Sequence, residues 1–228
     1  MIFLSRRDLD QQITPAVRRV LIAVPDRALN EVAGKIAEHS QVRVALHTCG
    51  ARGPEVLAAL AARGVECGTL HPLQTITQGT SLKGIAFAVW GDAGAVEWAE
   101  EIAALAGGEV LRIRPECRPL YHAAAVMASN YLITLLDASQ TLLAQCGVAP
   151  EAALRALGPL ARTSIENALK YGPANALTGP IERGDRETVA AHLEALKAAP
   201  ARIRHLYAAA GLETLDLIWK RQSASPNC

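Results

Sequence analysis

The chain has 228 residues, of which 50% are hydrophobic and 20% are charged. That apolar share is enough for a folded core, so a disordered or fibrous protein is excluded. The 23 basic and 22 acidic side chains nearly cancel, and only 4% of the residues are aromatic. A nucleic-acid-binding protein usually has a basic excess and aromatic side chains for base stacking, so we expect no nucleic-acid partner.

The N-terminal stretch argues against export from the cell. Residues 1–12 carry charges at Arg6, Arg7, Asp8 and Asp10 and lack the apolar segment of a secretory signal. No uncharged apolar run approaches the roughly 18 residues that span a bilayer. The five cysteines lie far apart without a C-x-x-C pair, which fits reduced thiols better than a disulfide framework. We therefore expect a cytoplasmic protein with no membrane partner.

Short β-branched segments alternate with helical segments in the first half of the chain. Residues 20–24 form a continuous apolar run that Pro25 ends, as expected for a strand buried on both faces. The predicted strands are Val20–Val24, Val42–Leu46, Val65–Leu70, Ala86–Trp90 and Val110–Ile113, and the predicted helices between them are Leu29–Glu38, Pro54–Ala62 and Ala93–Ala106. This alternation is typical of βαβ units, so we predict an α/β domain with a mostly parallel sheet.

Beyond Pro119 the strand pattern stops and helical segments dominate. The predicted helices are 120–146, 150–157, 160–171, 186–198 and 202–220. Residues 172–180 contain four Gly or Pro residues in nine and are predicted to be a loop. The expected architecture is α/β followed by all-α, with one domain over residues 1–118 and a helical domain over residues 119–228.

Polar residues follow three of the predicted strands directly. In an open parallel sheet, ligands bind outside the carboxyl ends of the strands. The clusters at these ends are Pro25-Asp26, His47-Thr48-Cys49-Gly50 and His71-Pro72-Leu73-Gln74. Taken singly, each member is equally well explained as a turn residue, so the prediction of a site rests on the three clusters together.

A second group of polar residues lies on the long predicted helix that opens the second half. His122, Ser129 and Asn130 are seven and eight residues apart, which places them on nearly the same helix face. They either reach into a cleft between the domains or form a satisfied polar cluster at a domain interface.

Other catalytic motifs are weak or absent from the sequence. No H-x-x-x-H, H-E-x-x-H or C-x-x-C spacing positions two metal ligands, and no G-x-S-x-G elbow is present, so we predict neither a metal site nor a serine hydrolase. The G-x-G-x-x-G turn that usually opens a dinucleotide-binding domain is also missing. Gly50 to Gly53, before the helix at Pro54, is the nearest candidate for holding an anion.

Five segments in order give the chain a recognisable resemblance. They are Val20–Asp26 (VLIAVPD), His47–Gly53 (HTCGARG), His71–Gln74 (HPLQ), Tyr121–Leu132 (YHAAAVMASNYL) and Leu177–Asp185 (LTGPIERGD). Together they resemble the Rossmann-like NADP oxidoreductases of the deazaflavin-dependent type that carry a C-terminal helical domain of unknown function. These proteins belong to the wider group of 6-phosphogluconate dehydrogenase, ketopantoate reductase and pyrroline-5-carboxylate reductase. The resemblance covers residues 20–196.

The resemblance implies an NADP-binding domain that packs on a helical domain, with the helical domain forming a homodimer. It assigns Val24, Pro25, Asp26, His47, Thr48 and Gly50 to the cofactor, and His71, Gln74, Thr178 and Gly179 to the cleft for a small-molecule substrate. It places His122, Ser129 and Asn130 as the catalytic group facing that cleft from the helical domain.

Two departures from these relatives bear on the activity. The first strand, glycine-rich turn and first helix of the Rossmann domain are missing, so either the start codon is placed too late or ordinary cofactor binding is lost. Met1–Arg7 resembles the second strand, which places Ser5, Arg6 and Arg7 where an NADP enzyme holds the 2′-phosphate; they are equally well an ordinary charged strand end. Where hydroxyacid-dehydrogenase relatives have a catalytic lysine, this chain has Val126. His122 is then the expected proton donor.

Three functions are compatible with these observations. The first is an NADP-dependent oxidoreductase that reduces a small carbonyl or imine. The alternative is a non-catalytic binding or scaffold protein on a reductase fold that has lost its dinucleotide cradle. A third, weaker interpretation is a metal-dependent enzyme built on His47, Cys49, His71 and His122.

Overall fold

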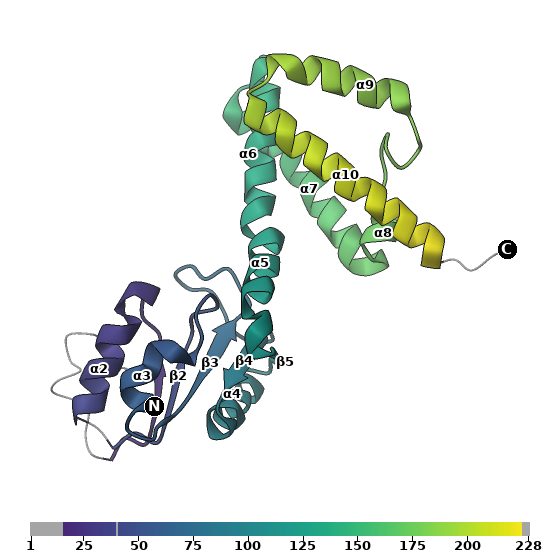
Figure 1. Cartoon of the computed structure of the whole chain (residues 1–228). Helices are drawn as coiled ribbons and strands as arrows, with labels where there is room; N and C mark the ends of the chain where they lie inside the picture. The colour runs from purple at the N-terminus through teal and green to yellow at the C-terminus, as the bar shows by residue number, and fades with distance from the viewer. Residues whose placement is uncertain (1–15, 40, 225–228) are drawn as a thin grey trace. The chain divides into compact units, whose positions relative to one another are not determined.

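The computed structural model describes residues 16–39 and 41–224, which form two compact units that divide between Asn130 and Tyr131 (Figure 1). The predicted boundary after residue 118 lies earlier, at the start of helix α5 (Arg118–Ala128), which belongs to the first unit.

The first unit is built on a five-stranded sheet, as the sequence predicted. Its strands are β1 (Arg19–Ile22), β2 (Val44–His47), β3 (Glu66–Pro72), β4 (Ala86–Gly91) and β5 (Glu109–Arg112), and they lie in the order β1-β2-β3-β4-β5. All neighbouring pairs are parallel except β3 and β4. Residues 73–85 between those two strands form no helix, so the chain turns back beside β3 instead of crossing over.

Helices cover both faces of this sheet. On one face, α2 (Leu29–His39), the 3-10 turn η2 (Pro54–Leu57) and α3 (Ala58–Ala61) enclose one apolar cluster. On the other face, α4 (Ala93–Leu105) covers a second cluster. Successive residues of β2 point to opposite faces, so Ala45 belongs to the first cluster and Leu46 to the second. The result is a three-layer α/β domain.

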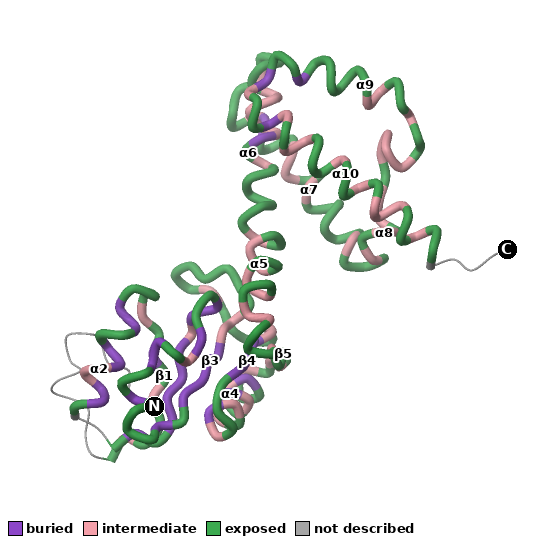
Figure 2. The backbone as a smooth tube through the Cα atoms, in the orientation of Figure 1, coloured by how far each residue is buried: buried purple, intermediate pink, exposed green. Residues whose placement is uncertain are grey.

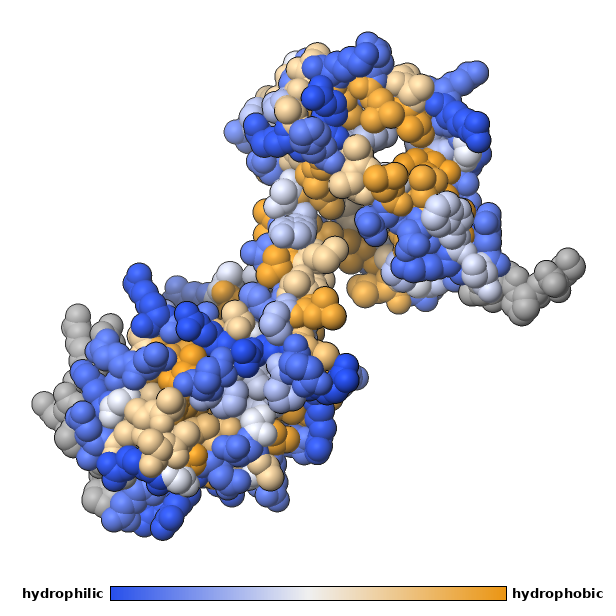
Figure 3. Space-filling model, in the orientation of Figure 1, coloured by the Kyte–Doolittle hydropathy of each residue, from blue (hydrophilic) through white to orange (hydrophobic). Residues whose placement is uncertain are grey.

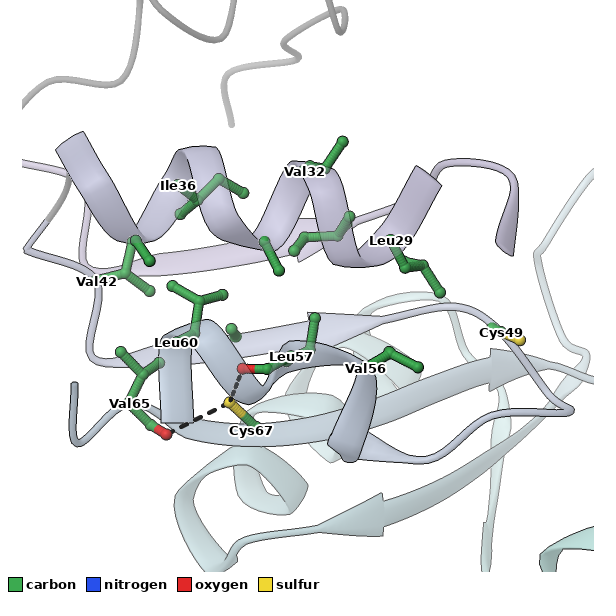
Figure 4. Packing of buried hydrophobic residues seen from close by; sticks show 14 residues of the cluster. Leu29, Val32, Ile36, Val42, Cys49, Val56, Leu57, Leu60, Val65 and Cys67 are labelled. Atoms are coloured by element: carbon green, nitrogen blue, oxygen red, sulfur yellow. Dashed lines mark hydrogen bonds between the residues drawn. The ribbon is translucent and has the colours of Figure 1, made fainter. Parts of the chain in front are cut away.

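Helix α2 packs its apolar side chains tightly against the sheet. Leu29, Val32 and Ile36 recur at helical spacing and are at most 2% exposed (Figure 4). The Cys67 thiol beneath them contacts the Leu57 and Val65 carbonyl oxygens at 3.9 and 3.4 Å. Burial raises the pKa of Cys67 to about 11, so this cysteine is a neutral core residue.

In the part that the structure describes, the second unit consists of helices joined by turns and has no strand. Its helices are α6 (Asn130–Gln145), α7 (Pro150–Tyr171), α8 (Pro173–Ala176), α9 (Arg186–Ala195) and α10 (Ala201–Ala224), with the 3-10 turn η4 (Leu196–Ala198) after α9. Asp185 caps α9, because its carboxylate accepts from the Thr188 N–H at 3.0 Å and the Thr188 hydroxyl at 2.7 Å.

Three predicted boundaries were wrong. The helix expected over 120–146 breaks at Ser129, whose φ of −122° and ψ of −75° lie outside the helical region. The helices expected on either side of Pro159 form one helix, α7. Pro159 lies on its exposed side, where water can satisfy the carbonyl group that loses its partner. The loop expected over 172–180 contains α8, because Pro173 at its first position is compatible with a helical turn.

The second unit buries few of its apolar side chains. The buried apolar residues that its described part contains are Ala138, Ala153, Leu196, Ala199 and Ile203. Figure 2 shows buried segments in the central strands β2, β3 and β4 of the first unit and mostly exposed or intermediate helices in the second. From residue 16 to 39 and from 41 to 224, each helix is too short or too polar to cross a membrane.

Candidate functional site

The carboxyl ends of β1, β2 and β3 meet at one edge of the first unit. The parallel register pairs Ile22 with His47 and His47 with Thr69, so the residues that follow each strand lie side by side. This edge therefore carries Asp26, Thr48 and His71 together, as expected for a ligand-binding edge.

His47 at the end of β2 is fully buried and bonded at both ring nitrogens. Its Nδ1 accepts from the Cys49 N–H at 3.2 Å, so the ring proton lies on Nε2. Nε2 is 3.0 Å from both the Gly53 carbonyl oxygen and the Thr69 hydroxyl. Burial lowers the pKa of His47, which keeps the ring neutral. His47 thus holds the turn of residues 48–53 against the sheet, and its ring is shielded from a ligand.

The neighbouring thiol is unsuited to nucleophilic chemistry. Cys49 is 6% exposed, and burial together with the Asp26 carboxyl raises its pKa. A cysteine nucleophile needs a lowered pKa and an accessible thiolate. Cys49 has neither, and it packs in the core cluster beneath α2.

The turn from Gly50 to Gly53 is filled by side chains of this chain. The Gly53 N–H donates to the Glu55 carboxylate at 3.0 Å, and both guanidinium nitrogens of Arg118 lie 3.1–3.2 Å from that carboxylate. Burial opposes ionisation of Glu55, but backbone N–H groups and Arg118 outweigh it and lower its pKa. The sequence suggested that this turn could hold an anion from a ligand, but the Gly53 N–H already bonds the Glu55 carboxylate. The ion pair between Glu55 and Arg118 connects α5 to this edge of the sheet.

His71 is the half-buried group that this edge presents. Its Nδ1 lies 2.6 Å from the Tyr121 hydroxyl on α5. A Cβ built on Gly50 would lie 2.6–2.8 Å from three atoms of the His71 ring, so only glycine allows this packing. Burial, followed by the nearby His122, lowers the pKa of His71 to about 4, while burial raises the pKa of Tyr121 to about 12. Near neutral pH both groups are uncharged.

Of the residues predicted on the long helix, His122 lies close to this histidine. The His122 ring is 6.4 Å from the His71 ring, centroid to centroid. The Ser129 hydroxyl is 3.2 Å from the hydroxyl of Thr75, which follows Gln74. Asn130 is the first residue of α6. Because the helix breaks at Ser129, the shared face predicted for these residues does not continue through the break. Ser129 lies instead beside the loop that follows β3, through its contact with Thr75.

The remaining predicted residues lie elsewhere. Gln74 is exposed and accepts from the Thr75 N–H at 2.8 Å. In the second unit, Thr178 lines a hollow of about 340 Å³ together with His192 and Tyr207, and Gly179 beside it has φ +102°. Ser5, Arg6 and Arg7 lie outside the described residues. The roles assigned to all of these residues stay predictions.

Two aromatic residues of this site were not singled out from the sequence. Tyr121 contacts His71 through its hydroxyl, and the ring of Trp90 on β4 packs against the ring of Tyr121 with the two centroids 5.9 Å apart. Trp90 is 2% exposed. Tyr121 lies beside His122 in YHAAAV, and that adjacency was the available signal. Within the described ranges, no three His, Cys, Asp or Glu residues gather as they would around a metal ion.

Comparison with known families places the chain. A Rossmann-like domain matches residues 7–72, and a domain of unknown function, DUF2520, matches residues 85–214, more than half of the chain. The chain belongs to the DUF2520 family. The predicted resemblance to Rossmann-like proteins with a helical C-terminal domain is thereby confirmed.

Solved structures agree with this assignment. Protein TM1727 from Thermotoga maritima has a TM-score of 0.80 at 23% identity, covering 94% of this chain and 82% of its own. A Bacteroides fragilis protein, suggested by its name to be an NADP oxidoreductase, has a TM-score of 0.70 at 22% identity, covering 91% of this chain and 78% of its own. Pyrroline-5-carboxylate reductase from Coxiella burnetii has a TM-score of 0.57 at 14% identity, covering 97% of this chain and 80% of its own. None of the curated proteins compared with the chain matches it. At these identities the likenesses establish a shared fold for this DUF2520 protein.

Proposed function

We propose that this DUF2520 protein is an NADP-dependent oxidoreductase that reduces a small carbonyl or imine substrate. The observation that carries the proposal is the pair of histidines, His71 and His122, at the carboxyl edge of a Rossmann-like sheet. The shared fold adds support, since pyrroline carboxylate reductase from Plasmodium falciparum, with a TM-score of 0.57 at 11% identity, was solved with NADP bound.

The described edge fits the nicotinamide end of the cofactor. Pro25 and Asp26 are exposed after β1, and Thr48 is half-buried after β2, so these three are accessible at the sheet edge that carries His71. The turn at Gly53 does not fit the pyrophosphate, because Glu55 already occupies its N–H. NADPH, when bound, supplies a hydride to the electrophilic carbon of the substrate.

The chain's own residues supply orientation and a proton. His122 is the proposed proton donor to the substrate oxygen or nitrogen, and its ring, 6.4 Å from the His71 ring, is close enough for both to contact one small substrate. Ser129, held near Thr75, is placed to orient a polar substituent. Gly50 packs on one face of the His71 ring and shields that face from water.

A calorimetric titration with NADPH and NADH tests this function. We expect micromolar binding of NADPH, followed by NADPH consumption with a carbonyl or imine from a small panel. Absence of binding for either nucleotide at millimolar concentration would reject the proposal and favour the non-catalytic binding or scaffold protein.

We also infer that the second unit pairs with a second copy of this chain. On α10, Leu212 and Trp219 are 68% and 63% exposed and, with Leu215, lie at i, i+3 and i+7. On α7, Leu160 and Leu169 are 65% and 83% exposed. Figure 3 shows apolar surface over the helices of this unit. This unit exposes a large apolar surface and has a small core, which favours binding of another apolar surface. A second copy of the chain in a two-fold dimer provides such a surface.

A further inference from the structure

We infer that Tyr121 fixes His71 in the tautomer with its proton on Nε2, and that this N–H donates a hydrogen bond to the carbonyl oxygen of the substrate. The inference rests on the proposed function and deepens it. It names a substrate class, a carbonyl compound in preference to an imine, and it makes His71 a catalytic residue and Tyr121 a positioning residue.

The short contact between Tyr121 and His71 indicates which atom donates. The oxygen-to-nitrogen distance is 2.6 Å, below the usual range for an N–H donor and suited to an O–H donor. Within the described residues the Tyr121 hydroxyl has no other hydrogen-bond acceptor than Nδ1 of His71. Since the hydroxyl donates, Nδ1 carries the lone pair and Nε2 carries the proton.

The other edge of the ring is left for a ligand. A Cβ built on Gly50 would lie 2.6, 2.7 and 2.8 Å from Nε2, Cε1 and Cδ2, so Gly50 packs on the face of the ring and not on its edge. In the part of the chain that the structure describes, no hydrogen bond engages Nε2. A half-buried N–H donor without a partner is costly unless a ligand or water accepts from it.

The surroundings keep this donor uncharged. The groups that act on His71 are His122 of α5 and His47 of β2, which oppose a positive charge, and Asp26 after β1, which favours one. Burial and the two histidines outweigh Asp26, and the Tyr121 hydroxyl that donates to Nδ1 further favours the neutral ring. His71 therefore donates without carrying the transferred proton, which comes from His122.

A neutral N–H donor discriminates between the two substrate classes. A carbonyl oxygen gains negative charge as hydride reaches its carbon, and a fixed N–H aimed at it stabilises that charge. An imine is reduced most readily as its protonated iminium, whose nitrogen has a proton and no lone pair. Such a substrate offers nothing for Nε2–H to donate to, so the site favours carbonyl compounds.

The tautomer is tested by nitrogen NMR of the whole chain labelled with 15N-histidine, with the His71 signals assigned through His71→Gln. We expect Nε2 protonated, Nδ1 as acceptor, and titration of His71 well below that of an ordinary histidine. Tyr121→Phe should raise the titration midpoint by about one pH unit and mix the tautomers, while Tyr171→Phe, at an exposed position, changes neither. A proton on Nδ1 in the wild type, or no change in Tyr121→Phe, overturns the inference.

The substrate class is tested separately by NADPH consumption with 2-oxo acids and with cyclic imines. We expect turnover of the oxo acids, and a lower kcat with an unchanged KM for NADPH in Tyr121→Phe. Turnover of imines alone, or of neither class, overturns the carbonyl assignment. The NMR result does not need the cofactor, so failure of NADPH to bind would reject the proposed function without affecting the tautomer.

Discussion

The two units of this chain handle apolar surface in opposite ways. The first covers both faces of its sheet with helices and buries side chains such as Leu29, Leu46 and Val89 almost completely. The second, although nearly all helix, leaves Leu169 and Trp219 largely exposed and buries mainly alanines. A unit with a complete core can hold a site in fixed geometry, whereas a unit with an incomplete core needs another surface to complete it.

The largest expected effect comes from changing the exposed face of α10. Replacing Leu212 and Trp219 together with glutamate would place two unpaired carboxylates in the proposed interface, so we expect dimer dissociation to be favoured by about 100-fold or more. Analytical ultracentrifugation measures this. Glu213→Gln on the same helix is the control. A wild-type chain that is monomeric at high micromolar concentration would contradict the dimer.

The buried histidine of the first unit comes next. His47→Ala removes the ring bonded to Gly53 and Thr69 and leaves a cavity, so we expect the free energy of unfolding to fall by about 3 kcal/mol. Chemical denaturation followed by circular dichroism measures it. A loss below about 1 kcal/mol would show that His47 does not organise the 48–53 turn.

His122 tests the chemistry rather than the fold. His122→Ala should lower kcat by about 100-fold, because the proton donor is lost, while the Kd for NADPH changes little. Steady-state kinetics and calorimetry on one preparation separate the two quantities. A loss of cofactor affinity as large as the loss of rate would remove His122 from the proton-donor role.

Gly50 and Gly34 make a matched pair within the first unit. Gly50→Ala brings a Cβ against the His71 ring, so we expect about 2 kcal/mol of destabilisation and loss of the Tyr121 contact. Gly34 lies in α2 with nothing within 4 Å of a built Cβ, so Gly34→Ala should stabilise by about 0.5–1 kcal/mol. Equal effects in the two variants would show that His71 does not pack on Gly50.

The smallest effect is a dependence of stability on pH. The pKa of His71, about 4 in the folded chain, lies below its ordinary value of 6.5, so the unfolded chain binds the proton more readily. Stability from this residue is complete above pH 6.5 and is lost as pH falls toward 4; His47 acts in the same direction. We expect the Tm to drop by a few degrees over this range, and to drop less in His71→Gln.

The sequence predicted the first unit better than the second, and for a physical reason. Strands β2 and β4 are buried on both faces, so their apolar runs mark the sheet within a few residues. The burial on both faces expected for Val20–Val24 was wrong, because Leu21 is 39% exposed, yet its apolar run still located β1. In the helices of the second unit no single residue decides a boundary: Ser129 breaks a helix without Pro or Gly, and Pro159 does not break one. These outcomes depend on packing and on hydration of the exposed backbone.

The site was predictable in outline only. That polar residues gather after β1, β2 and β3 follows from the parallel topology. Which of them faces a ligand depends on contacts that sequence spacing does not encode. His47 and His71 look alike in the sequence, yet His47 is bonded at both nitrogens and His71 at one. His71 and Tyr121 are 50 positions apart in the sequence, so spacing gave no sign of the contact that distinguishes His71 from His47.

The most direct test is whether NADPH reaches the edge that carries His71. In the 15N-histidine spectrum of the wild-type chain, we predict that adding NADPH shifts the His71 Nε2 signal, while the His205 signal on α10 stays in place. If calorimetry shows that NADPH binds and the His71 signal does not move, the cofactor lies elsewhere and the carboxyl edge of the first unit is not the reaction site.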